Sequence, residues 1–281
     1  TSDVDPIAEF HPDASLELDL TRNQVIDDAK PAFKKVRYEA QKLGDGYRVR
    51  YTATGFDGAK AVREAIVGAN EMSLVDLDPR LQVGFIPDEV TWAYGMEPPS
   101  GHGNLGYRPM KGAKTTALVV TYAVAADQVS DVFWEGSDSA VRDGTGAEQP
   151  SVWFPVKGGE IGYFHSTDGL VECLLAIDGS GPSSCSRALE ADADSGRAVR
   201  IVSVGGGGTP FYWNLQAVVV LPERAAEPKL ELAGKPLALV VEPFQGGLAV
   251  LANADKLTLE PDEADLRVTF RDASGQLVEV R

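Results

Sequence analysis

The amino-acid sequence predicts a mainly β fold, antiparallel and sandwich-like, with a minor helical contribution near residues 58–72 and a small C-terminal β module. The 29 glycines and 17 prolines are spread along the chain at intervals that suit turns between short strands. Apolar runs of strand length, rich in β-branched residues, follow one another in the second half. Amphipathic helices do not alternate with these runs, which disfavours a parallel α/β architecture.

The first part of the chain combines a short strand, a hairpin and one helix. Leucines alternate with acidic residues over Leu16–Leu20, as in a half-buried strand. Apolar and polar residues also alternate on both sides of Gly44-Asp45-Gly46, which predicts a hairpin there. From Gly58 to Met72 the apolar residues fall at helical spacing, so this segment is the predicted helix.

From about residue 115, near-continuous apolar runs predict strands that are covered on both faces. These runs are Ala117–Ala125, Val152–Val156, Leu170–Ile177, Val199–Val204 and Gln216–Leu221. We therefore interpret residues 1–221 as a mainly β or α+β region whose sandwich core begins at about residue 115.

A boundary is predicted after this region. Residues 222–228 form a polar segment that begins and ends with proline, as in a linker. Short strand patterns separated by glycine-containing turns fill residues 229–281. This pattern predicts a small all-β module, or else the closing strands of a larger sandwich.

The charge of the chain excludes some classes of partner. With 42 acidic and 26 basic residues the formal net charge is −16, which repels phosphate backbones and anionic lipids. We therefore expect neither a nucleic acid nor a membrane surface as the partner. No apolar stretch is long enough for a transmembrane helix, so membrane insertion is not expected either.

The two cysteines indicate the compartment. Cys173 and Cys185 flank an apolar run followed by the turn-forming segment Asp178–Pro182. The chain should double back there and bring the two thiols within disulfide distance, and the alternative is a pair of free buried thiols. A disulfide would point to an oxidising, extracytoplasmic location: secreted, cell-surface or periplasmic.

Acidic residues supply weak candidates for chemistry. We expect no cofactor, and calcium is the alternative, because Asp192 and Asp194 resemble half of a calcium-binding loop. A solvated acidic turn is the preferred interpretation of these two residues. Glu135 and Glu172 lie in or beside apolar segments, where a buried acid would titrate abnormally, but a surface position on an alternating strand is the preferred interpretation of both. No motif typical of a serine hydrolase is present, so no catalytic residue is assigned.

Neighbouring aromatic residues are the candidates for binding. In a strand, adjacent side chains point to opposite faces, so one ring of each pair should be exposed and able to contact a sugar or a protein. The candidates are Trp92, Tyr94, Trp134, Trp153, Tyr212 and Trp213. Packing in the core is the competing interpretation of these rings.

These observations favour a non-enzymatic binding or assembly protein outside the cytosol: a cell-surface, periplasmic or virion component. The expected partner is a protein or a polysaccharide, and a homo-oligomer or a larger assembly is a further expectation. The alternative is a hydrolase that acts on polysaccharide with paired carboxylates, whose pairing in space leaves no local sequence signature.

Overall fold

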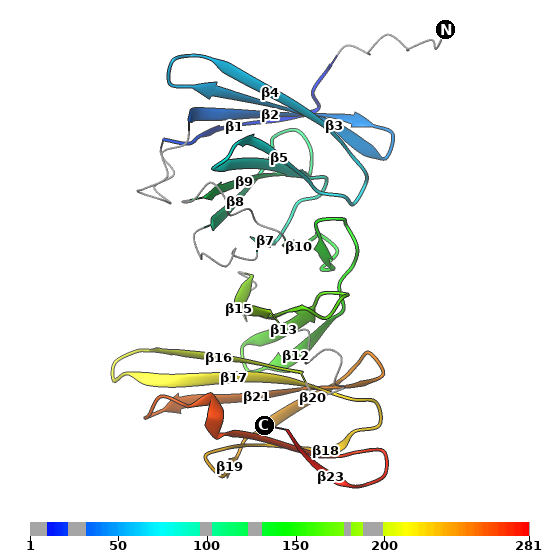
Figure 1. The fold of residues 1–281 in the computed structure, drawn as a ribbon, viewed down its shortest axis with the longest axis vertical. Coiled ribbons are helices and arrows are strands. Elements are labelled where there is room, and N and C mark those ends of the chain that lie inside the picture. Colours follow the sequence, from blue (N-terminus) through cyan, green and yellow to red (C-terminus); the bar gives the residue numbers. More distant parts are fainter. Residues whose placement is uncertain are drawn as a thin grey trace. The chain divides into compact units, whose positions relative to one another are not determined.

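The structure is a computed structural model that describes residues 10–21, 32–95, 103–122, 131–176, 181–187 and 199–280 (Figure 1). The chain forms two compact units, Thr1–Glu148 and Gln149–Arg281. All strand pairs are antiparallel, and the one helical element among the described residues is the 3-10 turn η1 (Glu263–Asp265). The mainly β, antiparallel fold is therefore confirmed. No helix of the described residues is long and apolar enough to cross a membrane.

The described residues of the first unit form three sheets. The first has the order β1-β2-β3-β4 and consists of β1 (Ala14–Asp19), β2 (Phe33–Leu43), β3 (Gly46–Gly55) and β4 (Lys60–Val67). The second has the order β5-β6-β9-β8 and consists of β5 (Ser73–Asp78), β6 (Leu81–Ile86), β9 (Thr116–Tyr122) and β8 (Gly103–Pro109). The third has the order β11-β10-β7 and consists of β11 (Val141–Asp143), β10 (Val132–Glu135) and β7 (Trp92–Gly95).

The β5-β6-β9-β8 sheet is buried on both faces, which makes it the middle layer of its unit (Figure 1). Phe85 of β6 and Val119 of β9 pack against the β1–β4 sheet. Leu118, which points to the other face, packs with Trp134 of the β11-β10-β7 sheet. The core of this unit thus begins with the first strands of the chain, well before residue 115.

The predicted hairpin at Gly44-Asp45-Gly46 is confirmed. β2 and β3 pair without interruption from Lys35↔Thr54 to Leu43↔Gly46, so the turn needs only two residues. Gly44 has φ +62°, a conformation that glycine adopts without a steric penalty. Alternate residues of both strands then face the core, where the rings of Tyr38 and Tyr51 meet edge to face at 5.6 Å.

Three sheets are also formed by the part of the second unit that the structure describes. The first has the order β12-β13-β14-β15 and consists of β12 (Ser151–Val156), β13 (Gly159–His165), β14 (Val171–Leu175) and β15 (Pro182–Arg187). The second has the order β16-β17-β21-β20 and consists of β16 (Val199–Gly207), β17 (Tyr212–Leu221), β21 (Gly247–Leu257) and β20 (Leu239–Phe244). The third has the order β19-β18-β22-β23 and consists of β19 (Lys235–Pro236), β18 (Ala226–Leu232), β22 (Leu266–Arg271) and β23 (Leu277–Val280).

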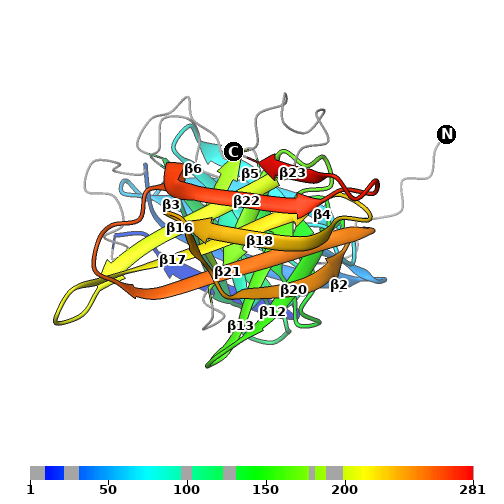
Figure 2. The same ribbon diagram turned by 90° about the horizontal axis from the view of Figure 1, so that it is seen from below.

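The β16-β17-β21-β20 sheet is the middle layer of the second unit (Figures 1 and 2). Val219 of β17 packs with Val268 of β22 on one face. Val218, its neighbour, packs with Tyr163 of β13 on the other face. Burial on both faces explains why β17 is almost continuously apolar, as the sequence predicted for such strands.

The helix predicted over residues 58–72 is wrong, because Lys60–Val67 forms strand β4. β4 pairs with β3 from Tyr47↔Val67 to Thr54↔Lys60, and Glu64 forms ion pairs of 2.7 Å with Arg48 and Arg50 of β3. Ala61 and Ala65 pack on the core, whereas Ile66 is 77% exposed. The spacing of the alanines and their neighbours is compatible with both a helix and a strand. Pairing with β3 favours the strand.

The units divide at Glu148/Gln149, not at the predicted linker 222–228. β17 ends at Leu221 and pairs with β21 of the region predicted to be a separate module, so one sheet spans the segment. The segment turns at once, since the backbone N–H of Ala225 donates to the carbonyl oxygen of Pro222 at 3.1 Å, and β18 begins at Ala226. Proline and polar residues therefore mark a tight turn inside one unit.

The hydroxyl of Tyr38 donates a buried hydrogen bond of 2.7 Å to the carbonyl oxygen of Leu118, which ties the outer β1–β4 sheet to the middle sheet. Replacing Tyr38 by Phe leaves this carbonyl without that donor, so the free energy of unfolding should fall by about 1–2 kcal/mol. Urea denaturation measures the change. Tyr47→Phe is the control, because the ring of Tyr47 also lies in this core, against Phe85. Equal losses in both variants would contradict the role of the Tyr38 bond.

Candidate functional site

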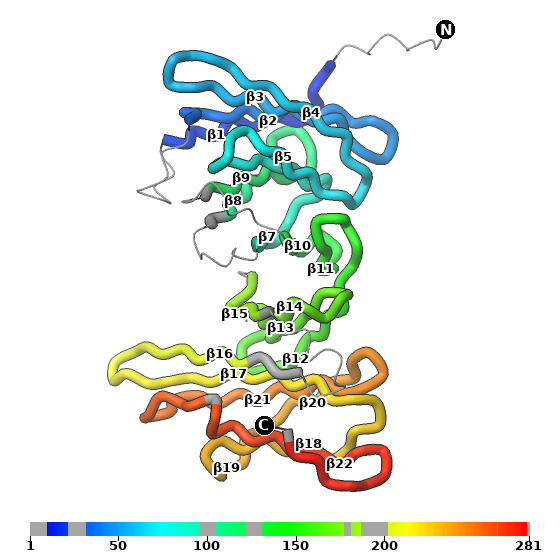
Figure 3. The backbone as a smooth tube through the Cα atoms, viewed as in Figure 1, coloured from blue at the N-terminus to red at the C-terminus, as the bar shows by residue number. Residues whose placement is uncertain are grey.

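A long hairpin in the second unit carries two residues of the predicted binding set, Tyr212 and Trp213, next to the exposed ring of Phe211. β16 and β17 pair without a register shift from Val199↔Val220 to Gly207↔Tyr212. The turn projects beyond the neighbouring strands of the unit (Figures 2 and 3). No charged residue occurs between Ile201 and Pro222, the longest such stretch in the chain. We call residues 203–213 the hairpin tip.

Two rings of the hairpin tip lie over a glycine. Phe211 is 56% exposed, and its ring meets the ring of Trp213 edge to face at 5.2 Å. A Cβ atom added to Gly206 would lie 2.5 Å from Cζ of Phe211 and 3.1 Å from Cε3 of Trp213. Glycine at position 206 thus makes room for both rings, which form a small apolar surface.

The two predicted binding residues of this hairpin, Tyr212 and Trp213, lie on opposite faces of β17 because side chains alternate along a strand. Trp213 lies on the same face of β17 as Leu215, which packs toward β18 and β22. Tyr212 lies on the opposite face, and both side chains are half-buried. Phe211 and Gly206 were not among the predicted binding residues, although the uncharged run of glycines and aromatic residues was visible in the sequence.

The structure does not bring the six predicted aromatic residues together in one site. Trp92 and Trp134 are each only 1% exposed, so their prediction as surface binding residues is wrong. Trp134 packs between β10 and the middle sheet of the first unit, where the Arg142 guanidinium lies 5.3 Å from its ring. Trp92 is paired with Glu135 across β7 and β10, so its ring lies on the opposite face of that sheet from Trp134. Tyr94 and Trp153 are half-buried and belong to different units.

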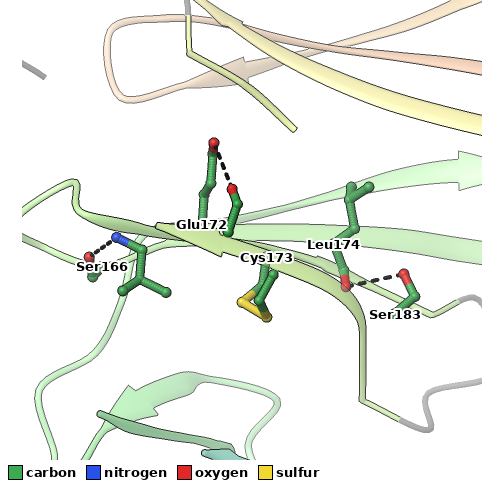
Figure 4. The surroundings of a disulfide bond; sticks show 8 residues. Ser166, Glu172, Cys173, Leu174 and Ser183 are labelled. Carbon is green, nitrogen blue, oxygen red and sulfur yellow. Dashed lines mark hydrogen bonds between the residues drawn. A yellow bond between two sulfur atoms is a disulfide. The ribbon is translucent and has the colours of Figure 1, made fainter. Parts of the chain in front are cut away.

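The predicted disulfide between Cys173 and Cys185 is confirmed (Figure 4). The two cysteines are directly opposite each other on β14 and β15, with their Cα atoms 4.1 Å apart. The apolar run before the turn became β14, and the turn returned the chain beside it, as the sequence indicated.

Glu172 lies next to the disulfide but points to the other face of β14 (Figure 4). It is only 4% exposed, which excludes the surface position considered for it. The Tyr163 hydroxyl donates to its Oε2 at 3.2 Å, and the Ser186 hydroxyl donates to its Oε1 at 3.3 Å. Burial raises the pKa of the Glu172 carboxyl, and these two hydrogen bonds and the opposing His165 partly offset the rise.

His165 is held at the end of β13 by several contacts. Its Nδ1 donates to the carbonyl oxygen of Ser166 at 2.7 Å, and its Nε2 lies 2.7 Å from Oε1 of Gln245. Its ring meets the ring of Phe244 edge to face at 5.3 Å. Each of these contacts fixes the imidazole within the β12–β15 and β20–β21 layers.

Glu135, at the end of β10, is the second buried acid, at 7% exposed. Burial raises its pKa, the hydrogen bond from Trp92 lowers it, and the charge of Asp138 raises it further. Arg142 holds the pKa of Asp138 well below its usual range through hydrogen bonds of 2.8 and 2.5 Å. Two carboxyls with opposite pKa shifts are therefore close to each other in the first unit.

The calcium candidates Asp192 and Asp194 lie outside the described residues. Within the described ranges, no group of three or more His, Cys, Asp or Glu side chains is arranged to hold a metal ion. Comparison of the chain with protein-family models, with curated proteins and with solved structures found no match.

The raised pKa of Glu172 predicts how stability depends on pH. The folded protein holds this proton more tightly than the unfolded chain, so stability is fully present below the usual carboxyl pKa of 4.5 and is lost as the pH rises through the folded-state value. Glu172→Gln has no such proton to lose. The free energy of unfolding of the variant should therefore rise relative to that of the wild type as the pH increases from 4 to 8.

Unfolding free energies measured by urea denaturation across this pH range check the prediction. Glu160→Gln, an exposed acid on β13 of the same sheet, is the control. Parallel pH profiles for Glu172→Gln and the wild type would show that Glu172 is not a destabilising buried acid.

Proposed function

We propose that this chain is a non-enzymatic binding or assembly protein that works outside the cytosol, as a cell-surface, periplasmic or virion component, and contacts a protein or polysaccharide partner through the hairpin tip. The exposed ring of Phe211 carries the proposal. An aromatic side chain exposed by more than half, on a projecting and uncharged hairpin, adds nothing to the core but is well suited to contact a partner.

The charge distribution supports this choice. The chain has a net charge of −16, yet the stretch that includes the hairpin tip has no charged residue. Charged residues are depleted at the centre of protein interfaces, while Tyr, Trp and Phe are enriched there. Contacts made by this tip therefore depend on apolar packing and backbone hydrogen bonds.

The disulfide supports the location. Disulfides persist in oxidising compartments and are rare in the cytosol of most organisms. Cys173 and Cys185 close a loop with a sequence separation of 12, for which the chain-entropy model gives about 3 kcal/mol of stabilisation.

The carboxyl pair of Glu135 and Asp138 favours a second candidate function, a hydrolase that acts on polysaccharide. Carboxyls whose pKa values are shifted in opposite directions are typical of general acid and base pairs. Both carboxyls already have partners within the chain, which weighs against a catalytic role. Arg142 donates a hydrogen bond to Asp138, and Trp92 donates one to Glu135. Release of reducing ends from a panel of polysaccharides, lost in Glu135→Gln, would establish the hydrolase and overturn the non-enzymatic proposal.

Site-specific photo-crosslinking tests the proposal. A photoreactive p-benzoylphenylalanine in place of Phe211 should give adducts when the protein is exposed to the surface material of its source cells. The same residue in place of Phe56, which is 64% exposed in the first unit, is the matched control. Adducts specific to position 211 should be identified by mass spectrometry as protein or glycan.

Phe211→Ser should weaken the same interaction about tenfold, the usual cost of removing a central aromatic contact. Adducts at positions 211 and 56 in equal amounts, or at neither position, would contradict the proposed role of the hairpin tip.

A further inference from the structure

The outer edge of the hairpin lacks the features that usually keep sheet edges from pairing. Among the described strands, β16 pairs only with β17 and therefore forms one edge of the middle sheet. Its residues Ile201–Gly207 contain no charge and no proline, and the pairing with β17 contains no bulge. Proteins usually protect edge strands with Lys, Pro, bulges or short length.

The opposite edge of the same sheet has this protection. β20 carries Glu242 and Pro243, and proline removes a backbone donor from the edge. β4, an edge strand of the first unit, carries Lys60, Arg63 and Glu64. Residues Ile201–Gly207 of β16 thus lack the proline and charged residues that protect the edges formed by β20 and β4.

The backbone of the hairpin tip can be approached closely. A Cβ atom added to Gly205 or Gly207 would meet no atom within 4 Å. Residues 205–210 are exposed, so the backbone N–H and C=O groups on the outer side of this edge are accessible to a strand from another molecule. Beside them, the rings of Phe211 and Trp213 cover Gly206 and would extend over an added strand.

The net charge of the chain and the self-complementarity of a backbone edge indicate which molecule pairs with β16. Two copies that each carry a net charge of −16 repel each other over most of their surfaces, and the charge-free stretch is where they approach at the lowest cost. A backbone edge offers both donors and acceptors, so it is complementary to itself. Most homo-oligomers use such a self-complementary, two-fold interface.

We propose that the β16 edge pairs antiparallel with the β16 edge of a second copy of this chain, so that the two middle sheets form one continuous sheet. This inference rests on the proposed function, because it names the protein partner of the hairpin tip. Each copy places the same segment, Ser203–Gly207, against its equivalent. The rings of Phe211 and Trp213 then flank the new strand pair.

Sedimentation velocity over a range of protein concentrations tests the pairing. The wild type should pass from monomer to dimer, and higher salt should strengthen the dimer because it screens the repulsion between two acidic molecules. The double variant Gly205→Asp/Gly207→Asp places like charges on the paired edges and should weaken the dimer more than about tenfold. Val241→Asp adds one negative charge to the opposite edge strand, β20, and should leave the dimer unchanged.

A circular dichroism spectrum establishes that the double variant is folded. If it is not, Phe211→Ser, which changes an exposed ring, replaces it and should also weaken the dimer. A wild type that remains monomeric at the highest concentration, or a Val241→Asp variant as impaired as the edge variants, would overturn the inference. A monomer that still forms specific adducts at position 211 with another molecule would overturn the pairing alone. A monomer without such adducts would overturn the proposed function as well.

Discussion

Burial of one sheet on both faces is the constraint on which each unit depends. In the first unit the β5-β6-β9-β8 sheet separates two apolar clusters, and in the second the β16-β17-β21-β20 sheet does the same. Strands in such a position are buried at nearly every residue, as in β6, whereas β2 and β3 of an outer sheet alternate between buried and more exposed residues.

Burial on both faces explains why the C-terminal part of β17 carries no charge, but it does not explain the absence of charge at the start of the strand. From Leu215 to Leu221 the strand lies inside the core, where a charge would be costly. Within the hairpin tip, Val204 packs on the margin of that core, but residues 205–211 are exposed, so the core does not require them to be free of charge. An uncharged, aromatic tip with an open backbone edge is instead the composition that contact with another chain favours.

Much of the fold was predictable from local patterns. The Gly44-Asp45-Gly46 hairpin and the disulfide follow from turn residues close in sequence, which act within one pair of strands. The prediction of a helix over residues 58–72 was wrong because the helical and strand patterns overlap there, and the pairing with β3, with its ion pairs from Glu64 to Arg48 and Arg50, does not show in the local pattern. The burial of Trp92, Trp134, Glu135 and Glu172 was not predictable, since it depends on which sheet covers another.

Near Leu215, β17 changes from a buried core strand to a more exposed hairpin, which we propose binds a partner, and amide hydrogen exchange measured by mass spectrometry tests this change. In dilute protein, peptides that cover residues 215–221 should exchange slowest and those that cover 203–213 much faster. In concentrated protein, the 203–213 peptides should become protected while the rest of the chain stays unchanged. Protection of residues 203–213 equal to that of 215–221 in the dilute monomer would contradict the claim, because the chain itself would already cover this edge.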